Sequence, residues 1–370
     1  MKTILCCFVL SFLFSCSNFV STEDRMAQGN NKTALEDYTG AIEAYSLVLE
    51  ANPNHAEAYT ERGFAYSEVE NYDAALADLD KAIELDPESH RAFNSRGLLF
   101  SDLGEDERAI KNYNLAIELE LNGAVLYYNR GVSYSNLGDH EAALADFDAA
   151  LEITPDDPDC FYRKGETYYE LYALEMAMEE FNKCLEINSN YYDALIGRAD
   201  TKESIEDYDG ALEDYNRAIE LHPEKPIGYN NRGYTFSQQK NYAAALQDFD
   251  KVLELAPKYA SAYVNKGDIQ VNLKQYQKAI KTYQEALLLD ENITTRTSLA
   301  EAYELIKDYE AAIENYTQVI AIDSTYGSDF LARGLLYIKT KEKQKACLDF
   351  EIALELEEDK AIQAFNKYCK

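Results

Sequence analysis

Small, aromatic and aliphatic residues recur along most of the chain with a period of 34 residues, and polar residues separate them. Glycine marks each period: Gly63, Gly97, Gly131 and Gly165 are 34 residues apart. An alanine follows twelve residues after each of these glycines, as at Ala75. Self-similarity at such a period indicates small supersecondary units that stack on one another and share a continuous core.

Within one period the spacing of the apolar residues predicts two helices. In the unit that begins near residue 56, Tyr59, Gly63 and Tyr66 are four and three residues apart and share one face of a first helix. A second helix carries a stripe of apolar residues: Tyr72, Ala75, Leu79 and Ala82. Pro87 follows, where its fixed φ and missing N–H end the second helix. The pattern predicts an all-α fold of antiparallel helix pairs.

These features together resemble the tetratricopeptide repeat (TPR) family. The resemblance rests on a small residue at position eight of the unit, an aromatic at position eleven, alanine at position twenty and proline at position thirty-two. It implies a right-handed superhelical solenoid of about ten hairpins over residues 22–358. The units are expected to start near residues 22, 56, 90, 124, 158, 192, 226, 260, 293 and 327. We expect the first unit to be degenerate and residues 359–370 to form a capping helix over the last repeat.

Position seven of most units is basic, where TPR proteins usually have leucine. The basic residues are Arg62, Arg96, Arg130, Lys164, Arg198, Arg232, Lys266 and Arg333. Sixteen residues after them come Asp78, Asn112, Asp146, Glu180, Asp214, Asp248, Thr282 and Asp349. Where position seven is Leu299, its counterpart is the neutral Asn315. This covariation predicts a ladder of ion pairs that links the two helices of a hairpin, or adjacent hairpins.

Residues 1–15 have the pattern of a signal peptide, because Lys2 is followed by an apolar run that is too short to span a membrane. Residues 13–16, Leu-Phe-Ser-Cys, resemble the lipobox of bacterial lipoproteins. The resemblance implies that Cys16 becomes the acylated first residue and that residues 16–30 contain a lipidated tether and the degenerate start of the array. An ordinary secretory signal is the alternative.

The expected location follows from this segment. We expect a protein of the bacterial cell envelope that is held by its N-terminal lipid in the outer membrane and faces the periplasm. A secreted or periplasmic protein is the alternative. Four cysteines remain in the folded part, and two pairs are candidates for disulfides in an oxidising compartment. A bridge between Cys347 and Cys369 would hold the C-terminus, whereas Cys160 and Cys184 either form a bridge or pack as small apolar residues.

Charge and motifs narrow the classes of function. The chain has 67 acidic and 35 basic residues and a formal net charge of −32, which excludes non-specific nucleic-acid binding. No phosphate-binding glycine loop, nucleophile elbow or histidine pair with metal-ligand spacing occurs in the sequence. We therefore expect no enzymatic activity, no cofactor, no metal and no small-molecule substrate.

The resemblance places a peptide-binding groove on the concave face, along the first helices of the units. The corresponding residues are Asn94, Tyr128, Asn129, Tyr162, Glu166, Tyr169, Asp200, Glu203, Asn230, Asn231, Tyr234 and Asn265. Basic residues at the groove positions are almost limited to Arg91 and Lys339. The carboxylate clamp of chaperone-binding TPR proteins needs lysine and arginine at these positions, so we do not expect one here. A groove of amides, phenols and carboxylates favours an extended protein segment that is neutral or basic. The acidic residues are equally explained as surface groups that keep the array soluble.

From these features we expect a non-enzymatic scaffold that binds a partner protein or extended peptide at the cell envelope. The alternative is an envelope chaperone or carrier that binds unfolded segments transiently.

Overall fold

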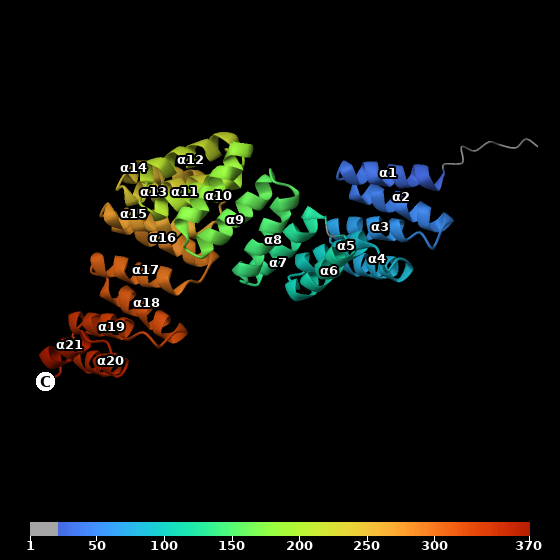
Figure 1. Ribbon diagram of the computed structural model, residues 1–370. Helices are drawn as coiled ribbons and strands as arrows, with labels where there is room; N and C mark the ends of the chain where they lie inside the picture. Colours follow the sequence, from blue (N-terminus) through green and yellow to red (C-terminus); the bar gives the residue numbers. More distant parts are fainter. Residues whose placement is uncertain (1–20, 121) are drawn as a thin grey trace, which may run out of the picture. The chain divides into compact units, whose positions relative to one another are not determined.

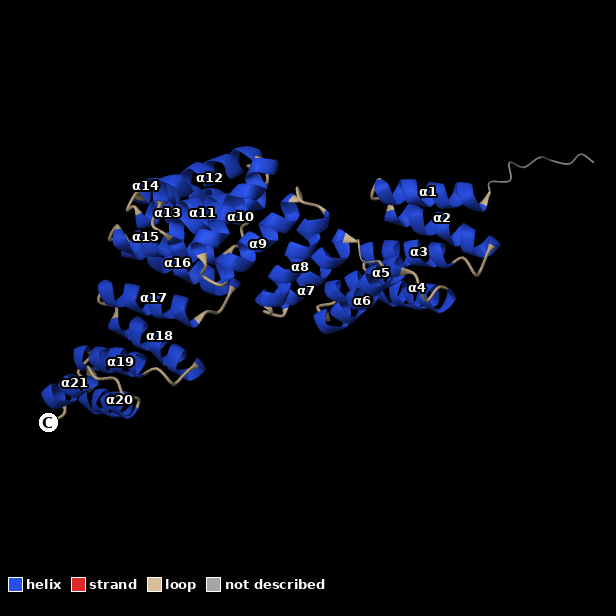
Figure 2. Cartoon of the chain, viewed as in Figure 1, coloured by secondary structure: helices blue, strands red, loops and turns tan. Residues whose placement is uncertain are grey.

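The computed structural model describes residues 21–120 and 122–370, and this part of the chain consists of helices joined by short turns (Figure 1). Within the described residues there is no strand (Figure 2). No helix of this part is long and apolar enough to cross a membrane. Cys16 and the predicted signal peptide lie outside the described residues.

The chain divides into two compact units, with the division between Thr167 and Tyr168. The first unit contains α1 (Thr22–Ala34), α2 (Tyr38–Ala51), α3 (Ala56–Glu68), α4 (Tyr72–Leu85), α5 (His90–Asp102), α6 (Asp106–Leu119), α7 (Ala124–Asn136), α8 (His140–Ile153) and most of α9 (Pro158–Glu170). The second unit begins in the last turn of α9 and contains α10 (Leu174–Ile187), α11 (Tyr192–Ser204), α12 (Tyr208–Leu221), α13 (Pro226–Gln238), α14 (Tyr242–Leu255), α15 (Ala260–Asn272), α16 (Tyr276–Leu289), α17 (Ile293–Leu305), α18 (Tyr309–Ile322), α19 (Gly327–Lys339), α20 (Lys343–Glu355) and α21 (Ala361–Tyr368).

Each hairpin closes where a small residue of its first helix meets a large residue of its second helix. A Cβ atom added at Gly131 of α7 would lie 2.7 Å from Cε1 of Phe147 on α8. The ring of Phe147 is fully buried because the missing side chain of Gly131 leaves room for it. The same relation holds for Gly97 and Tyr113 in the preceding hairpin. The prediction of an all-α fold built from TPR hairpins is confirmed.

The turn inside each hairpin contains one residue with positive φ. Two of these residues are Gly104 and Gly138, with φ of 72° and 76°. Most turns use a residue with a side chain instead, such as Lys240 at φ 59°. The following residue caps the second helix in several hairpins, as where Asp139 Oδ1 accepts a hydrogen bond from the Ala142 N–H at 3.2 Å.

The predicted ion-pair ladder is confirmed for the arginine–aspartate pairs, and it has a second set of contacts. Arg130 of α7 donates to both carboxylate oxygens of Asp146 on α8, with Nε–Oδ2 and Nη2–Oδ1 distances of 2.7 and 2.6 Å. Its third nitrogen, Nη1, donates to Asn114 Oδ1 of α6 at 2.6 Å. One guanidinium group therefore joins its own hairpin to the preceding one, so both arrangements expected from the covariation occur together.

The same geometry recurs in both units. Bidentate pairs join Arg62 to Asp78, Arg198 to Asp214, Arg232 to Asp248 and Arg333 to Asp349. Contacts to the preceding hairpin join Arg62 to Ser46, Arg96 to Asp80, Lys164 to Asp148, Arg198 to Asn182, Arg232 to Asn216, Lys266 to Asp250 and Arg333 to Thr317. One predicted counterpart differs, because Thr282 donates to Gln270 at 2.8 Å and Lys266 pairs with Asp250 instead.

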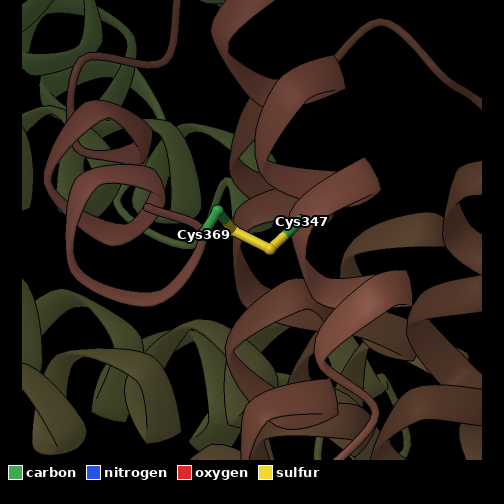
Figure 3. The surroundings of a disulfide bond; sticks show 2 residues. All are labelled: Cys347 and Cys369. Carbon is green, nitrogen blue, oxygen red and sulfur yellow. A yellow bond between two sulfur atoms is a disulfide. The ribbon is translucent and has the colours of Figure 1, made fainter.

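The last helix covers the end of the array. Ala361 and Ala364 of α21 pack into the cluster around Phe350. A disulfide between Cys347 of α20 and Cys369, the residue that ends α21, joins the two helices (Figure 3). Cys160 and Cys184 are instead buried thiols, in agreement with the packing interpretation of these residues.

Candidate functional site

The candidate site is the surface formed by the first helix of each hairpin, called here the first-helix face. In the first unit α1, α3, α5 and α7 contact one another in succession, and in the second unit α11, α13, α15 and α17 do so. The predicted groove residues on α5, α7, α11, α13 and α15 therefore lie on neighbouring helices within each unit.

In the first unit, the predicted polar residues are bonded to one another. Asn129 Nδ2 of α7 donates to Asn94 Oδ1 of α5 at 3.0 Å. Arg163, which the sequence analysis did not include, donates from Nε to the Tyr128 hydroxyl at 3.4 Å and from Nη1 to Glu166 Oε2 at 3.0 Å. The hydroxyl of Tyr162 donates to the other oxygen of Glu166 at 2.5 Å. The charge of Glu166 is thus balanced inside the chain by Arg163.

A pocket of about 330 Å³ lies between α3, α5 and α7. Its apolar lining includes Phe64, Leu98 and Val125, and Asn94 adds an amide. Arg91 also lines the pocket but is paired, because its Nη2 lies 2.5 Å from Glu61 Oε1 and its Nη1 lies 3.6 Å from Glu57 Oε1. Burial raises the pKa of the Glu61 carboxyl, and the charge of Arg91 opposes this rise. This pocket suits an apolar side chain better than an anion.

In the second unit, Asp200 is the centre of a hydrogen-bond network. Its Oδ1 accepts from the Tyr215 hydroxyl of α12 and from Asn231 Nδ2 of α13, the second at 2.9 Å. Burial raises the pKa of the Asp200 carboxyl, while both donors oppose this rise. Glu203 Oε1 accepts from the Thr235 hydroxyl at 2.8 Å, and burial raises the pKa of this carboxyl too.

The other predicted residues of the second unit differ in how far they are engaged. The Tyr169 hydroxyl lies 3.3 Å from Ser204 Oγ. Asn230 Nδ2 donates to Asn231 Oδ1 at 3.1 Å, whereas the buried Oδ1 of Asn230 has no hydrogen-bond partner among the described residues. Tyr234 is 45% exposed and presents its ring to solvent. Asn265 is half-buried on α15.

The sequence analysis missed one coupling, between tyrosines of the second helices and polar residues of the first helices. These tyrosines donate hydrogen bonds to the residue fifteen positions earlier, on the first helix of the same hairpin. The pairs are Tyr45 with Asn30 at 2.9 Å, Tyr283 with Asp268 at 2.6 Å, and Tyr215 with Asp200. Tyr113 and Tyr316 differ, since their counterparts Leu98 and Glu301 accept no such bond in the described part of the chain. The sequence signal is an asparagine or aspartate followed fifteen positions later by tyrosine.

The chemistry of this surface is that of binding. Its side chains offer amides, phenols and carboxylates, and Asp200, Glu203 and Asp268 form no ion pair with a lysine or arginine of the described residues. No group of three or more His, Cys, Asp or Glu residues in residues 21–120 and 122–370 is arranged to hold a metal ion.

Sequence comparison identifies the repeat along most of the array. Tetratricopeptide repeat profiles match residues 33–99, 90–122, 124–157, 158–191, 226–259 and 258–325, and a TPR repeat profile matches residues 204–240. The chain belongs to the tetratricopeptide repeat family. No curated protein sequence matches it.

Solved structures with similar folds include TPR proteins. A tetratricopeptide repeat protein from Parabacteroides merdae ATCC 43184 has 22% identity and a TM-score of 0.55, and the match covers 67% of this chain and 98% of that chain. PilF of Pseudomonas aeruginosa has 20% identity and a TM-score of 0.52 over 59% of this chain and 97% of its own. YrrB, described as a TPR protein with an unusual peptide-binding site, has 27% identity and a TM-score of 0.41 over 50% of this chain and 95% of its own. The first two similarities show the fold.

Proposed function

We propose that this TPR protein is a non-enzymatic scaffold that binds an extended, neutral or basic segment of a partner protein along its first-helix face. The observation that supports the proposal is the state of the carboxylates in the second unit. Asp200, Glu203 and Asp268 are held by hydroxyl and amide donors, and no basic residue of the described chain neutralises them. Such carboxylates attract a positively charged segment and fix its position on the surface.

Two further features support an extended protein segment as the ligand. Tyr169 and Tyr234 supply rigid aromatic surface that loses little side-chain entropy on binding. The amides of Asn230, Asn231 and Asn265 are the kind of donors and acceptors that pair with an extended backbone.

We further propose that the scaffold acts at the bacterial cell envelope, held in the outer membrane by acyl chains on Cys16 and facing the periplasm. The support is the lipobox-like segment of residues 13–16 and the apolar run before it. Membrane fractionation tests this part: the wild-type chain should pellet with membranes, and C16S should release it to the soluble fraction. Equal membrane retention of the variant would contradict lipidation at this residue.

Crosslinking in cells followed by affinity purification tests the binding face. The variant Tyr169→Ala/Tyr234→Ala removes aromatic surface from the first-helix face, and Tyr172→Ala/Tyr326→Ala is the matched control. The control residues are turn tyrosines that are 75% and 58% exposed. We expect one or two stoichiometric partners that the face variant loses and the control variant keeps.

Two other outcomes would contradict parts of the proposal. Partners retained by the face variant would show that another surface carries the binding. A broad, salt-sensitive set of captured proteins would indicate a chaperone or carrier of unfolded segments instead of a scaffold.

A further inference from the structure

A second pocket, of about 470 Å³, lies in the first unit between α4, α5 and α6, which pack in succession (Figure 1). It shares no lining residue with the pocket between α3, α5 and α7. Its charged lining residues are three bases and one acid: Arg96, Arg108, Lys111 and Asp80. A chain with a net charge of −32 therefore carries a pocket whose own lining is positive.

The guanidinium group of Arg96 borders this pocket with one donor unused. In five other hairpins an aspartate opposite the arginine accepts hydrogen bonds from both Nε and Nη2. Asn112 stands at this place in α6, and its Oδ1 accepts from Arg96 Nε at 2.8 Å. Its Nδ2 is a donor and bonds to the Arg108 carbonyl oxygen at 2.8 Å, so Arg96 Nη2 has no hydrogen bond within the described residues.

The positive charges at the pocket are only partly balanced. Each arginine has one acidic partner: Asp80 pairs with Arg96 at 2.7 Å, and Glu105, which does not line the pocket, pairs with Arg108. Both carboxylates are about half exposed, and exposed ion pairs contribute little because water and salt screen them. Lys111 is exposed and forms no ion pair within the described residues. These groups leave one positive charge without a partner.

The repeats show that the charges at these places change together. Arg108 and Lys111 occupy positions nineteen and twenty-two of the unit. In the six hairpins with an acid at position twenty-three, only one of the twelve corresponding residues is basic, Lys345. The other hairpin in which the acid is missing below a basic position seven, the one with Thr282, has lysine at both positions, 278 and 281. Cations therefore accumulate where the internal acid is absent, although an internally balanced ladder would require the opposite.

A pocket of about 290 Å³ at the corresponding place in the second unit has a balanced lining. It lies between α10, α11 and α12, and it includes Arg198 and Asp214, the counterparts of Arg96 and Asn112. Its charged residues are two bases and two acids: Arg198, Arg217, Asp214 and Glu186. The positive lining is thus a property of the hairpin formed by α5 and α6, and not of every groove between hairpins.

We propose that the pocket between α4, α5 and α6 binds the carboxylate groups of an acidic protein segment. The segment supplies the negative charge that other hairpins obtain from their aspartate, and Arg96 Nη2 and Lys111 are the donors. Arg108 is held at the pocket by the buried ring of Phe100, whose centroid lies 3.8 Å from Arg108 Cζ. The inference goes beyond the proposed function, because it concerns a separate surface and a segment of the opposite charge.

The lining favours a carboxylate of a protein over a free phosphate. Arginine binds phosphate best with two parallel hydrogen bonds, and Arg96 has a single unused nitrogen. Leu76 and Leu115 also line the pocket and offer apolar surface to a side chain next to the carboxylate, which an inorganic anion lacks.

Asn112→Asp tests the proposal without endangering the fold. The new carboxylate should accept from both Nε and Nη2 of Arg96, as in five other hairpins, and it adds a negative charge at the pocket. Exchange of the α5 and α6 amides should slow about fivefold, while the acidic segment loses its site. A loss of binding in a more stable chain cannot result from misfolding.

A second variant, R108Q/K111Q, removes two exposed cations from the pocket. K240Q/K274Q is the matched control, because Lys240 and Lys274 are exposed turn residues with positive φ and their replacement gives the same change in net charge.

The probes are three N-acetylated twelve-residue peptides of alanine and serine with one central leucine and the same neutral fluorophore at the C-terminal end. They differ at the two residues after the leucine, which are both glutamate, both glutamine or both lysine. Fluorescence anisotropy with the full folded chain should show the glutamate peptide bound at least about tenfold more tightly than the other two. Asn112→Asp and R108Q/K111Q should each weaken this binding about tenfold, and the control variant should leave it unchanged.

Carbodiimide coupling locates the bound carboxylate, because it joins a carboxylate to an adjacent amine. Mass spectrometry should find the glutamate peptide linked to Lys111. Equal binding of the glutamate and glutamine peptides, unchanged binding in both pocket variants, or links only at other lysines would each overturn the proposal. Inorganic phosphate that binds more tightly than the glutamate peptide would also overturn it and would identify a free anion as the ligand.

These outcomes are independent of the proposed function. If cells yield a partner that depends on Tyr169 and Tyr234 but the glutamate peptide does not bind, the acidic-segment site is wrong and the scaffold function stands. If the glutamate peptide binds as expected but no partner depends on those tyrosines, the pocket is a carboxylate site and the first-helix face is not the binding surface.

Discussion

The ion-pair ladder leads to a specific prediction about stability, and the pair of Arg130 and Asp146 is the best place to test it. Asp146→Ala removes the carboxylate that holds two nitrogens of Arg130 at 2.7 and 2.6 Å. The Arg130 side chain is 19% exposed and that of Asp146 is 7% exposed, so this is not a surface ion pair. The substitution leaves a positive charge in a mostly buried place with one hydrogen bond, to Asn114.

The magnitude follows from what remains around the guanidinium group. Breaking a fully buried pair by removing one partner costs about 3–5 kcal/mol, and an exposed pair contributes about 0–1 kcal/mol. Arg130 keeps the bond to Asn114 and the rings of Tyr127 and Tyr134, whose centroids lie 5.6 and 5.9 Å from Cζ. We therefore expect Asp146→Ala to cost about 2–3 kcal/mol of local stability.

The chain contains natural versions of two milder changes. Arg96 has Asn112 in place of an aspartate, with Nε–Oδ1 at 2.8 Å, so Asp146→Asn should keep one hydrogen bond and cost about 1 kcal/mol. The repeat with Leu299 and Asn315 lacks the pair altogether. The double variant Arg130→Leu/Asp146→Asn reproduces that repeat, and it should recover most of the stability that Asp146→Ala loses.

Hydrogen exchange is the suitable assay, since a repeat array opens in parts and a single unfolding free energy is not well defined. Exchange of the α7 and α8 amides should speed up about 30-fold to 150-fold in Asp146→Ala, since about 1.4 kcal/mol corresponds to a factor of ten. The amides of α13 and α14 serve as the internal control, because the ion pair between Arg232 and Asp248 joins these two helices and stays intact. A change below about threefold in α7 and α8, or a double variant less stable than Asp146→Ala, would refute the reasoning.

Two further predictions concern the second unit. Because burial raises the Asp200 pKa above 3.8, the stability contributed by this site falls as pH rises from 3.8 through its folded pKa. Asp200→Asn should remove that pH dependence, so hydrogen exchange of the α11 amides at pH 4 and pH 7 should show a smaller loss of stability with rising pH than in the wild-type chain. The Asn30–Tyr45 bond shows that an amide can accept from the tyrosine. Cys369→Ser should release α21 and lower its local stability by about 3 kcal/mol, with the same exchange rates in reduced wild-type protein.

The sequence predicts the hairpins well because their packing depends on strict residue size at a fixed spacing. Gly131 can face Phe147 only if position eight is small, so the pattern is visible in almost every period. The ion pairs within each hairpin can be predicted from the sequence for a similar reason, since an arginine in a mostly buried place needs an acid or amide opposite it. The contacts to the preceding hairpin could not be predicted, because nothing in the sequence distinguishes Ser46, Asn114 and Thr317 from other polar residues; the structure places each of them beside an arginine.

The same reasoning explains why the site was predicted less well than the fold. The resemblance places acidic residues along the groove but does not distinguish which of them already have partners. A buried tyrosine fits the hydrophobic pattern whether or not its hydroxyl donates a hydrogen bond. The bonds of the second-helix tyrosines to Asp200 and Asp268 therefore cannot be recognised from that pattern. Only a comparison of positions fifteen residues apart separates tyrosine from phenylalanine in this role.

This distinction changes how the negative charge of the chain is interpreted. Asp200 and Asp268 each receive hydrogen bonds from within their own unit, so much of their bonding capacity is used before any partner arrives. These bonds fix the position of each carboxylate but supply no compensating positive charge, because tyrosine hydroxyls and asparagine amides are neutral donors. The two carboxylates therefore act on a basic segment mainly through their charge, which steers the segment to the first-helix face, and less through free hydrogen-bond acceptors.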